Sequence, residues 1–381
     1  MTYRFVTLLI LLSSLFFHSA CSQNRQTTPQ YDTIPLETKI GQMLMVGFHG
    51  FSVSDTSHII RDITEYKTGG VILFDYHVPE RSPNRNIESP SQTTQLIHDL
   101  QALSEVPLFM AVDQEGGRVA RLKTDRDFPQ HRSAAYLGKL NNPDSTRYFA
   151  RSMAKSLHEL GFNVNFAPVV DLNTNPQNPV IGMLDRSFGP DTDTVTMQAS
   201  IFLNEFTKQG ILGVLKHFPG HGSAWNDSHV GMADVTDTWD PVELEPYRML
   251  AEGNDPFAVM TAHVLNQNLD SEWPATLSAV IQNGILREEI GFQGVLFSDD
   301  MQMDAIRSFY GLETSVERAI AAGVDVLVFA NNSVYDPEIV PTVTAIIKDL
   351  VNSGTISEER IDLSYRRIIA EKNRLLSGKL E

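Results

Sequence analysis

The chain has 381 residues, of which 42% are hydrophobic and 20% charged, so it can bury a sizeable core in one large domain or two ordinary ones. Its formal net charge of −17 argues against a nucleic-acid partner, because nucleic-acid binding needs a basic face. The only cysteine, Cys21, leaves no disulfide framework and no thiolate metal cluster. A small neutral or amphoteric substrate is the easier partner.

Residues 1–20 have the pattern of a secretory signal peptide. Arg4 supplies a positive start, and 6–17 is an almost wholly apolar run that is too short to span a bilayer. Cys21 follows, at the position of the cysteine that becomes the lipidated N-terminus of bacterial lipoproteins; the alternative is a plain cleaved signal with an incidental cysteine. We expect a lipoprotein-type tether at 21–35 and an exported protein, lipid-anchored to the periplasmic or outer-membrane face of the bacterial cell envelope.

Eight short apolar runs follow, separated by amphipathic segments, and several of them come directly after Gly or Pro, as strands entered from a turn do. The predicted strands are 43–48, 71–74, 108–112, 164–170, 214–217, 258–262, 295–298 and 324–329. Two of the predicted helices are 143–160, which begins with Pro at its first position and ends before Gly161, and 357–376.

The alternation of strands and helices predicts a (β/α)8 TIM-type barrel that forms a single catalytic domain at 36–381. A doubly wound open sheet is the alternative. It would need a phosphate-binding type of glycine-rich loop, which we do not find in the sequence.

Charged and polar residues that directly follow the predicted strands are the site candidates, because the active site of such a barrel lies at the C-terminal ends of the strands. Asp113 and Arg121 follow the third strand, Arg186 the fourth, and Lys216 and His217 end the fifth. Such cations and carboxylates can form hydrogen bonds to several sugar hydroxyls at once. They could equally form a salt-bridge network in the barrel mouth, and both can be true.

Proton-transfer groups follow the fifth and seventh strands. Glycosidic cleavage needs two carboxylates, or a carboxylate and another proton donor. Asp299 is the nucleophile candidate because it directly follows the strand, whereas Asp300 could cap the next segment. Asp227 can orient the ring of His229 and support its imidazolium form, which predicts an acid/base pair. The alternative is a turn held by a bond from Asp227 to the backbone.

Four motifs carry a resemblance to a known family. They are Asp113-Gln114-Glu115-Gly116-Gly117-Arg118-Val119 with Arg121, Lys216-His217-Phe218-Pro219-Gly220-His221-Gly222, Asp227-Ser228-His229 and Ser298-Asp299-Asp300-Met301. Together they resemble glycoside hydrolase family three, in its single-domain bacterial β-N-acetylglucosaminidase branch, over nearly all of the mature chain. The Asp-x-His motif distinguishes that branch from the β-glucosidases, which place a Glu acid/base in a second domain.

The resemblance implies a retaining, exo-acting β-N-acetylhexosaminidase. Asp299 would form a covalent glycosyl-enzyme, and His229, assisted by Asp227, would act as acid and then as base. The substrate would be terminal non-reducing β-linked N-acetylglucosamine on peptidoglycan fragments, chitin oligosaccharides or related glycans, with no cofactor and no metal. The implied sugar-binding residues are Asp113, Arg121, Arg186, Lys216 and His217.

Other activities stay open on the sequence alone. A phosphorylase is possible because a histidine acid/base does not repel an anionic phosphate nucleophile, and a β-glucosidase is the near relative. A metal-dependent barrel hydrolase could use His217, His221, His229 and Asp299, although Lys216 would repel a cation. A lipoprotein that only binds sugars is the remaining class.

Overall fold

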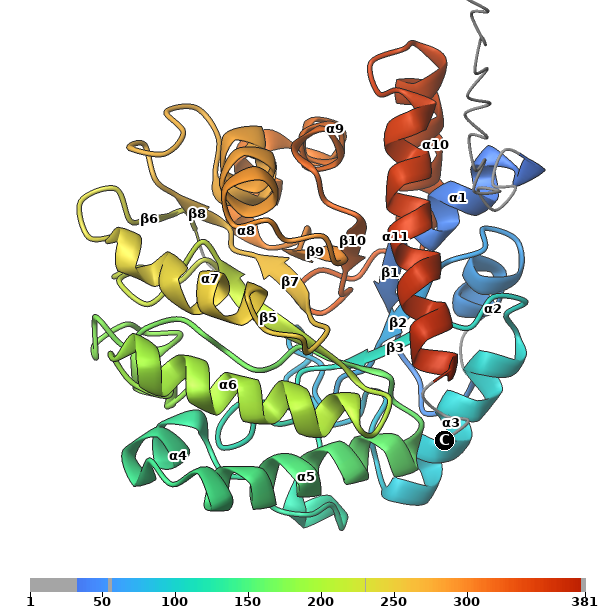
Figure 1. Ribbon diagram of the computed structural model, residues 1–381. Helices are drawn as coiled ribbons and strands as arrows, with labels where there is room; N and C mark the ends of the chain where they lie inside the picture. Colours follow the sequence, from blue (N-terminus) through green and yellow to red (C-terminus); the bar gives the residue numbers. More distant parts are fainter. Residues whose placement is uncertain (1–32, 54–56, 230, 378–381) are drawn as a thin grey trace, which may run out of the picture. The chain divides into compact units, whose positions relative to one another are not determined.

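The computed structural model describes residues 33–53, 57–229 and 231–377; the predicted signal peptide and Cys21 lie outside the described residues. Eight parallel strands close into a barrel in the order β1-β10-β9-β7-β5-β4-β3-β2, with helices around it (Figure 1). The predicted (β/α)8 TIM-type barrel is therefore confirmed. The barrel strands are β1 Leu44–Gly47, β2 Gly70–Ile72, β3 Phe109–Val112, β4 Val164–Asn165, β5 Leu212–Phe218, β7 Ala258–Thr261, β9 Leu296–Asp300 and β10 Val326–Phe329.

Each predicted strand has a counterpart in the barrel, and β4 differs most from its prediction. The sequence predicts a strand over 164–170, whereas β4 ends at Asn165. Pro168 interrupts the run, because proline has no backbone N–H to donate to a neighbouring strand. Val169 still forms an isolated parallel bridge with Lys216, so the segment stays beside β5.

Helices connect successive strands and cover the outside of the barrel. They are α1 Leu36–Gln42, α2 Ser57–Thr64, α3 Pro90–Ala102, α4 Ala134–Leu140, α5 Pro143–Leu160, α6 Thr192–Thr207, α7 Glu245–Ala251, α8 Asp304–Tyr310, α9 Leu312–Ala322, α10 Ile339–Asn352 and α11 Glu358–Ser377, with a π-helix at Val280–Glu289. Two short strands, β6 Ala233–Asp234 and β8 Val264–Leu265, pair outside the barrel. Within the described residues, no helix is both long and apolar enough to cross a membrane.

Helix α5 shows why the sequence prediction of 143–160 is confirmed at both ends. The Asn142 side chain accepts a hydrogen bond from the Ser145 backbone N–H, and Pro143 occupies the first helical position. At the other end Gly161 has φ 94°, a left-handed conformation that glycine adopts without strain. Met153 and Leu157 are buried on the inner face of the helix, where α5 packs against α6.

Aromatic rings fill the inside of the barrel below the site. The ring of Phe297 packs against Phe109 and Phe166, with centroid separations of 5.9 and 5.6 Å, and all three side chains are buried. This packing closes the barrel interior, as expected for a core rather than a pore. The polar side chains at the carboxyl ends of the strands therefore stand above an apolar floor.

Candidate active site

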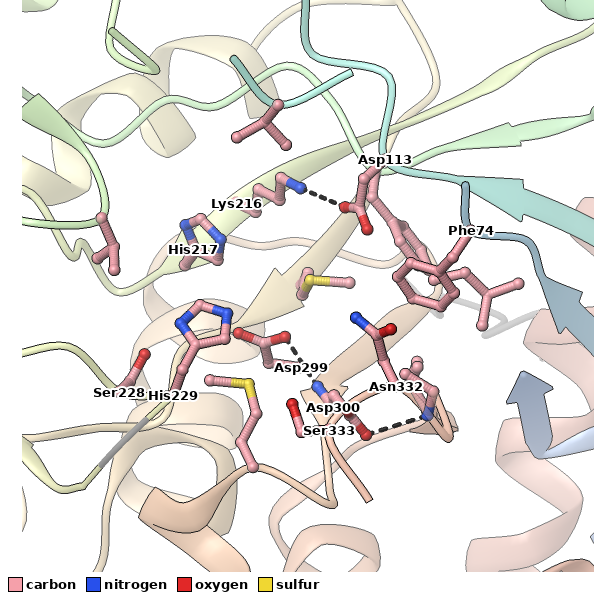
Figure 2. A pocket seen from close by; sticks show the side chains of 18 of the residues that line it. Phe74, Asp113, Lys216, His217, Ser228, His229, Asp299, Asp300, Asn332 and Ser333 are labelled. Atoms are coloured by element: carbon pink, nitrogen blue, oxygen red, sulfur yellow. Dashed lines mark hydrogen bonds and ion pairs between the residues drawn. The ribbon is translucent and has the colours of Figure 1, made fainter. Parts of the chain in front are cut away.

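A pocket lies at the carboxyl ends of the barrel strands (Figure 2). It brings together most of the sequence-predicted site residues, from β5, β9 and the loops that follow β3, β4 and β5: Asp113, Arg121, Arg186, Lys216, His217, His229 and Asp299. Asp227 is the exception, because it contacts the His229 ring and does not line the pocket.

Glu115 holds together the charged side chains on one side of the pocket. Its carboxylate accepts two hydrogen bonds of 2.8 Å from Arg186 and pairs with Lys216 at 2.7 Å. Lys216 also donates to Asp113 at 2.8 Å. Burial by itself would raise the pKa of Glu115, but Arg186 and Lys216 hold it well below its usual range. The salt-bridge network that the sequence left open is therefore present, with its cations already oriented.

Arg121 is the loosely paired cation of the site. Its guanidinium lies 3.7 Å from Asp113 and 4.0 Å from Asp75, and the side chain is 25% exposed. Asp75 has a closer partner, since Lys123 approaches it to 2.5 Å. The Arg121 backbone N–H is fixed by Gln114, so the residue is anchored while its charge remains available to a ligand.

Asp171, at the end of the fourth predicted strand, sets the orientation of His217. The Asp171 carboxylate accepts from the His217 ring at Nδ1, 2.7 Å away, and from the His217 backbone N–H at 3.1 Å. Arg186 lies 3.3 Å from the other ring nitrogen, Nε2, and arginine can only donate. His217 therefore carries its proton on Nδ1 and accepts at Nε2, a tautomer fixed by its neighbours.

Two adjacent carboxyl groups at the end of β9 have different environments. Burial would raise the pKa of Asp299, but the nearby rings of His263, His217 and His229 lower it to about 2. Burial raises the pKa of Asp300 to about 6, although its carboxylate accepts from the backbone of Gln302 and Ala330. Asp299 is thus a carboxylate at neutral pH, and Asp300 connects the ends of two strands.

The Asp227–His229 pair combines both arrangements that the sequence allowed. One oxygen of Asp227 accepts from the His229 ring at Nδ1, 2.7 Å away, and from the His229 backbone N–H at 2.8 Å. Burial would lower the pKa of His229, but the bond to Asp227 and the charge of Asp299 raise it. With Nδ1 engaged, Nε2 is the ring nitrogen that can exchange a proton with a ligand.

His221 and Ser228 connect the turn that carries Asp227 and His229 to the barrel. His221 Nε2 lies 3.2 Å from the Ser228 hydroxyl, and both side chains are buried in the pocket wall. The His221 backbone N–H donates to Asp171 at 2.8 Å, and its carbonyl accepts from Asn178 at 2.7 Å. Ser228, which precedes His229, is therefore bonded to a residue whose backbone is anchored at both its N–H and its carbonyl.

The sequence analysis missed several pocket residues that the structure reveals. Asn332 and Ser333 follow β10 and line the pocket, and the rule of reading polar residues after each strand could have found them. Phe74 lines the same wall, but no chemical signal marks it because it ends a predicted apolar strand. Glu115 stands in the first motif but does not line the pocket, and its role depends on Arg186 and Lys216, two partners distant in sequence.

The histidines considered for a metal site each have another partner. His217, His221 and His229 contact Asp171, Ser228 and Asp227, respectively. In the described parts of the chain, no group of three or more His, Cys, Asp or Glu side chains is arranged to hold a metal ion.

Comparison with known proteins gives consistent matches over almost the whole described barrel. Residues 35–370 match the glycosyl hydrolase family 3 N terminal domain. The chain is 33% identical to β-hexosaminidase A of Pseudoalteromonas piscicida, over 82% of this chain and 54% of that protein. It is also 33% identical to β-hexosaminidase LpqI of Mycobacterium tuberculosis, over 88% of this chain and 82% of that protein.

A solved structure with a similar fold is a glycoside hydrolase family 3 β-N-acetylglucosaminidase from Paenibacillus sp.. It has a TM-score of 0.82 and 35% sequence identity, covering 90% of this chain and 63% of that chain. The chain thus spans about half the length of the Pseudoalteromonas protein and somewhat less than two thirds of the Paenibacillus one.

Proposed function

This chain belongs to glycosyl hydrolase family 3, and on that basis we propose that it is a retaining, exo-acting β-N-acetylhexosaminidase. The observation that carries the proposal is that Asp299 and His229 line one pocket, with Asp227 bonded to the His229 ring from outside it. An ionised carboxylate and a histidine whose pKa is raised are the two groups that double displacement at a sugar carbon needs.

In the first step a carboxylate oxygen of Asp299 forms a bond to the anomeric carbon while the bond to the leaving oxygen breaks. The proton on His229 Nε2 goes to that oxygen, and Asp227 supports the ring through Nδ1. In the second step water attacks the anomeric carbon, His229 accepts its proton, and the bond to Asp299 breaks. Two inversions at one carbon give retention.

The charged cluster binds the sugar in this proposal. Lys216 and Arg186 are held in place by Glu115, so their orientation needs no rearrangement when a ligand arrives. Asp113 is 17% exposed and accepts from Lys216 through one oxygen, which leaves its other oxygen for a sugar hydroxyl. Arg121 supplies a further donor at the same wall, where the Nε2 of His217 accepts from Arg186.

The test compares nitrophenyl β-N-acetylglucosaminide with nitrophenyl β-glucoside, and runs chitin and peptidoglycan fragments alongside. We expect faster hydrolysis of the N-acetylglucosaminide, release of single non-reducing-end sugars, and initial product of retained configuration. Preference for the glucoside would overturn the proposal. Repeating the assay with inorganic phosphate tests for phosphorolysis, which a histidine acid favours over a carboxylate acid. Accumulation of sugar 1-phosphate would mean that the enzyme is a phosphorylase and not a hydrolase.

We also propose that the protein is exported and attached to the cell envelope by lipid on Cys21. The support is the signal-type sequence at 1–20 followed directly by the single cysteine. In detergent phase separation the native chain should enter the detergent phase, and Cys21→Ser should enter the aqueous phase. Mass spectrometry of the N-terminal peptide should show acyl chains on Cys21, and an unmodified cysteine there would overturn the proposal.

A further inference from the structure

Asn332 lines the pocket but takes part neither in the proposed mechanism nor in the charged cluster around Glu115. It follows the end of β10, is partly buried, and lines the pocket together with Asp299 and Asp300 (Figure 2). In the barrel order, β10 and β4 are separated by three strands on either side. Asn332 therefore faces the pocket from across the barrel relative to Arg186, which follows β4.

Arg85 determines which end of the Asn332 amide faces the pocket. Its guanidinium donates to the Asn332 side-chain oxygen at 2.5 Å and to the carbonyls of Ala330 and Asn331 at 2.8 and 2.9 Å. Arginine has only donors, so the amide atom facing Arg85 must be oxygen. The NH2 group of Asn332 is left on the opposite side, and Figure 2 shows it directed toward the Asp299 side of the pocket.

The position of Asn332 relative to the reacting carbon is fixed by the connection between β9 and β10. Asp300 accepts from the Ala330 backbone N–H at 3.0 Å, and Gln302 and Asn331 bond each other twice, at 2.7 and 3.0 Å. The segment that carries the nucleophile and the segment that carries Asn332 thus form one rigid unit. Asn332 is therefore held in a constant position relative to Asp299.

The surroundings of Asn332 suit a carbonyl group that carries a methyl. Phe74, Met303 and Ala330 supply apolar surface in the same pocket, and Phe74 is held by the Arg85 guanidinium 4.7 Å from its ring centroid. Arg186, Lys216 and Glu115 pair with one another. Arg121 borders this apolar surface, with its guanidinium 5.5 Å from the Phe74 ring centroid. A neutral donor beside apolar groups binds an amide carbonyl without burying an unpaired charge.

We propose that the Asn332 NH2 group donates a hydrogen bond to the carbonyl oxygen of the sugar's 2-acetamido group, and that Arg85 is the residue that positions it. This inference rests on the proposed function, since it names how that site distinguishes N-acetylglucosamine from glucose. C2 adjoins the carbon that Asp299 attacks, and Asn332 belongs to the same β9–β10 unit as Asp299 and lines the same pocket.

The test measures kcat/KM for nitrophenyl β-N-acetylglucosaminide and nitrophenyl β-glucoside in the native chain, Asn332→Asp and Asn332→Ala. Asn332→Asp keeps the shape and the acceptor for Arg85 but has no N–H to donate. We expect the ratio of the two kcat/KM values to fall about tenfold in both variants, because only one substrate loses a hydrogen bond. The ratio is measured within one sample, so a partly misfolded variant lowers both rates and leaves it unchanged.

A second measurement uses a modified N-acyl substrate and does not require hydrolysis of the glucoside to be measured. An N-trifluoroacetyl substrate keeps the size of the group but has a carbonyl that accepts a hydrogen bond more weakly. The native chain should lose more kcat/KM with this substrate, relative to the N-acetyl one, than Asn332→Ala does. Asn268→Ala is the matched control, because that asparagine donates to the Thr236 carbonyl outside the pocket and should leave both ratios unchanged.

The possible results distinguish an error in the role of Asn332 from an error in the proposed function. If the native chain hydrolyses the N-acetylglucosaminide but both Asn332 variants keep the native ratio within about twofold, less than one hydrogen bond is worth, the assignment of Asn332 is wrong and the proposed function stands. If the native chain shows no preference for the N-acetylglucosaminide, the proposed function fails, and the assignment fails with it.

Discussion

The charged cluster around Glu115 and the turn that carries His229 lie in one pocket but differ in how the protein holds them. The side chains of Glu115 and Lys216 are 4% and 2% exposed, and each has more than one charged partner. The side chains of Asp227 and His229 are 33% and 55% exposed, and their pairing is local, between residues two positions apart. The charged cluster, proposed to bind the sugar, is buried and paired over long sequence distances, whereas the proposed proton donor is on a more exposed turn.

This difference follows from what each group has to do. A binding wall benefits from cations that are oriented before the ligand arrives, because no reorganisation is then needed in the transition state. A general acid has to exchange its proton with an aglycone or with water, so access to solvent at Nε2 is useful. Changes in the two regions should accordingly have different consequences: loss of turnover in one, and loss of stability and of binding in the other.

The largest effect is expected from Asp299, the proposed nucleophile at the end of β9, which belongs to neither of the two regions. Asp299→Asn should lower kcat on the order of ten-thousand-fold, because an amide cannot form the glycosyl ester. Steady-state rates on the nitrophenyl N-acetylglucosaminide measure this, with the thermal midpoint as the control for folding. Turnover near the native rate would remove Asp299 from this role.

His229→Ala tests the exposed region and should show a dependence on the leaving group. For aglycones that need protonation, kcat/KM should fall by about a hundred- to ten-thousand-fold. For a dinitrophenyl glycoside, which departs without a proton, the loss should be much smaller. Equal losses for both kinds of aglycone would mean that His229 does not act as the acid.

Glu115→Gln tests the buried cluster and should act on stability and binding together. It leaves Arg186 and Lys216 buried without their shared anion, which should lower the free energy of unfolding by about 3 kcal/mol. Urea unfolding measures this, and KM should rise as the cations lose their orientation. Asp144→Asn breaks an exposed ion pair with Arg147 and is the matched control, for which little change is expected. Equal effects of the two variants would contradict the contrast between the regions.

Asp227→Asn should produce the smallest change, a shift of the pH profile. Burial lowers the pKa of His229, whereas the bond to Asp227 raises it, so loss of the Asp227 charge lowers the pKa. The protonated acid is then lost at a lower pH, and the alkaline limb of kcat/KM should move toward acid. The acidic limb belongs to Asp299 and should stay in place. A shift of the alkaline limb in the other direction would contradict the assignment.

The sequence by itself determined the architecture and most of the pocket. Apolar runs bounded by glycine, proline and amphipathic helices identify the strands, since these signals are local and α5 satisfies its own caps. A parallel barrel places the carboxyl ends of all its strands at one face. Asp113, Lys216, His217 and Asp299, which stand at strand ends, could therefore be assigned to one pocket before their contacts were known.

Only the tertiary structure decided how those groups are oriented and charged. Arg85 meets Asn332 across 247 positions of sequence, and Glu115 meets Arg186 across 71, so no local pattern indicates either pair. Asp299 and Asp300 are identical in type and adjacent, yet their pKa values move in opposite directions. The physical reason is that desolvation and charge interactions depend on distance in space, which the chain order does not contain.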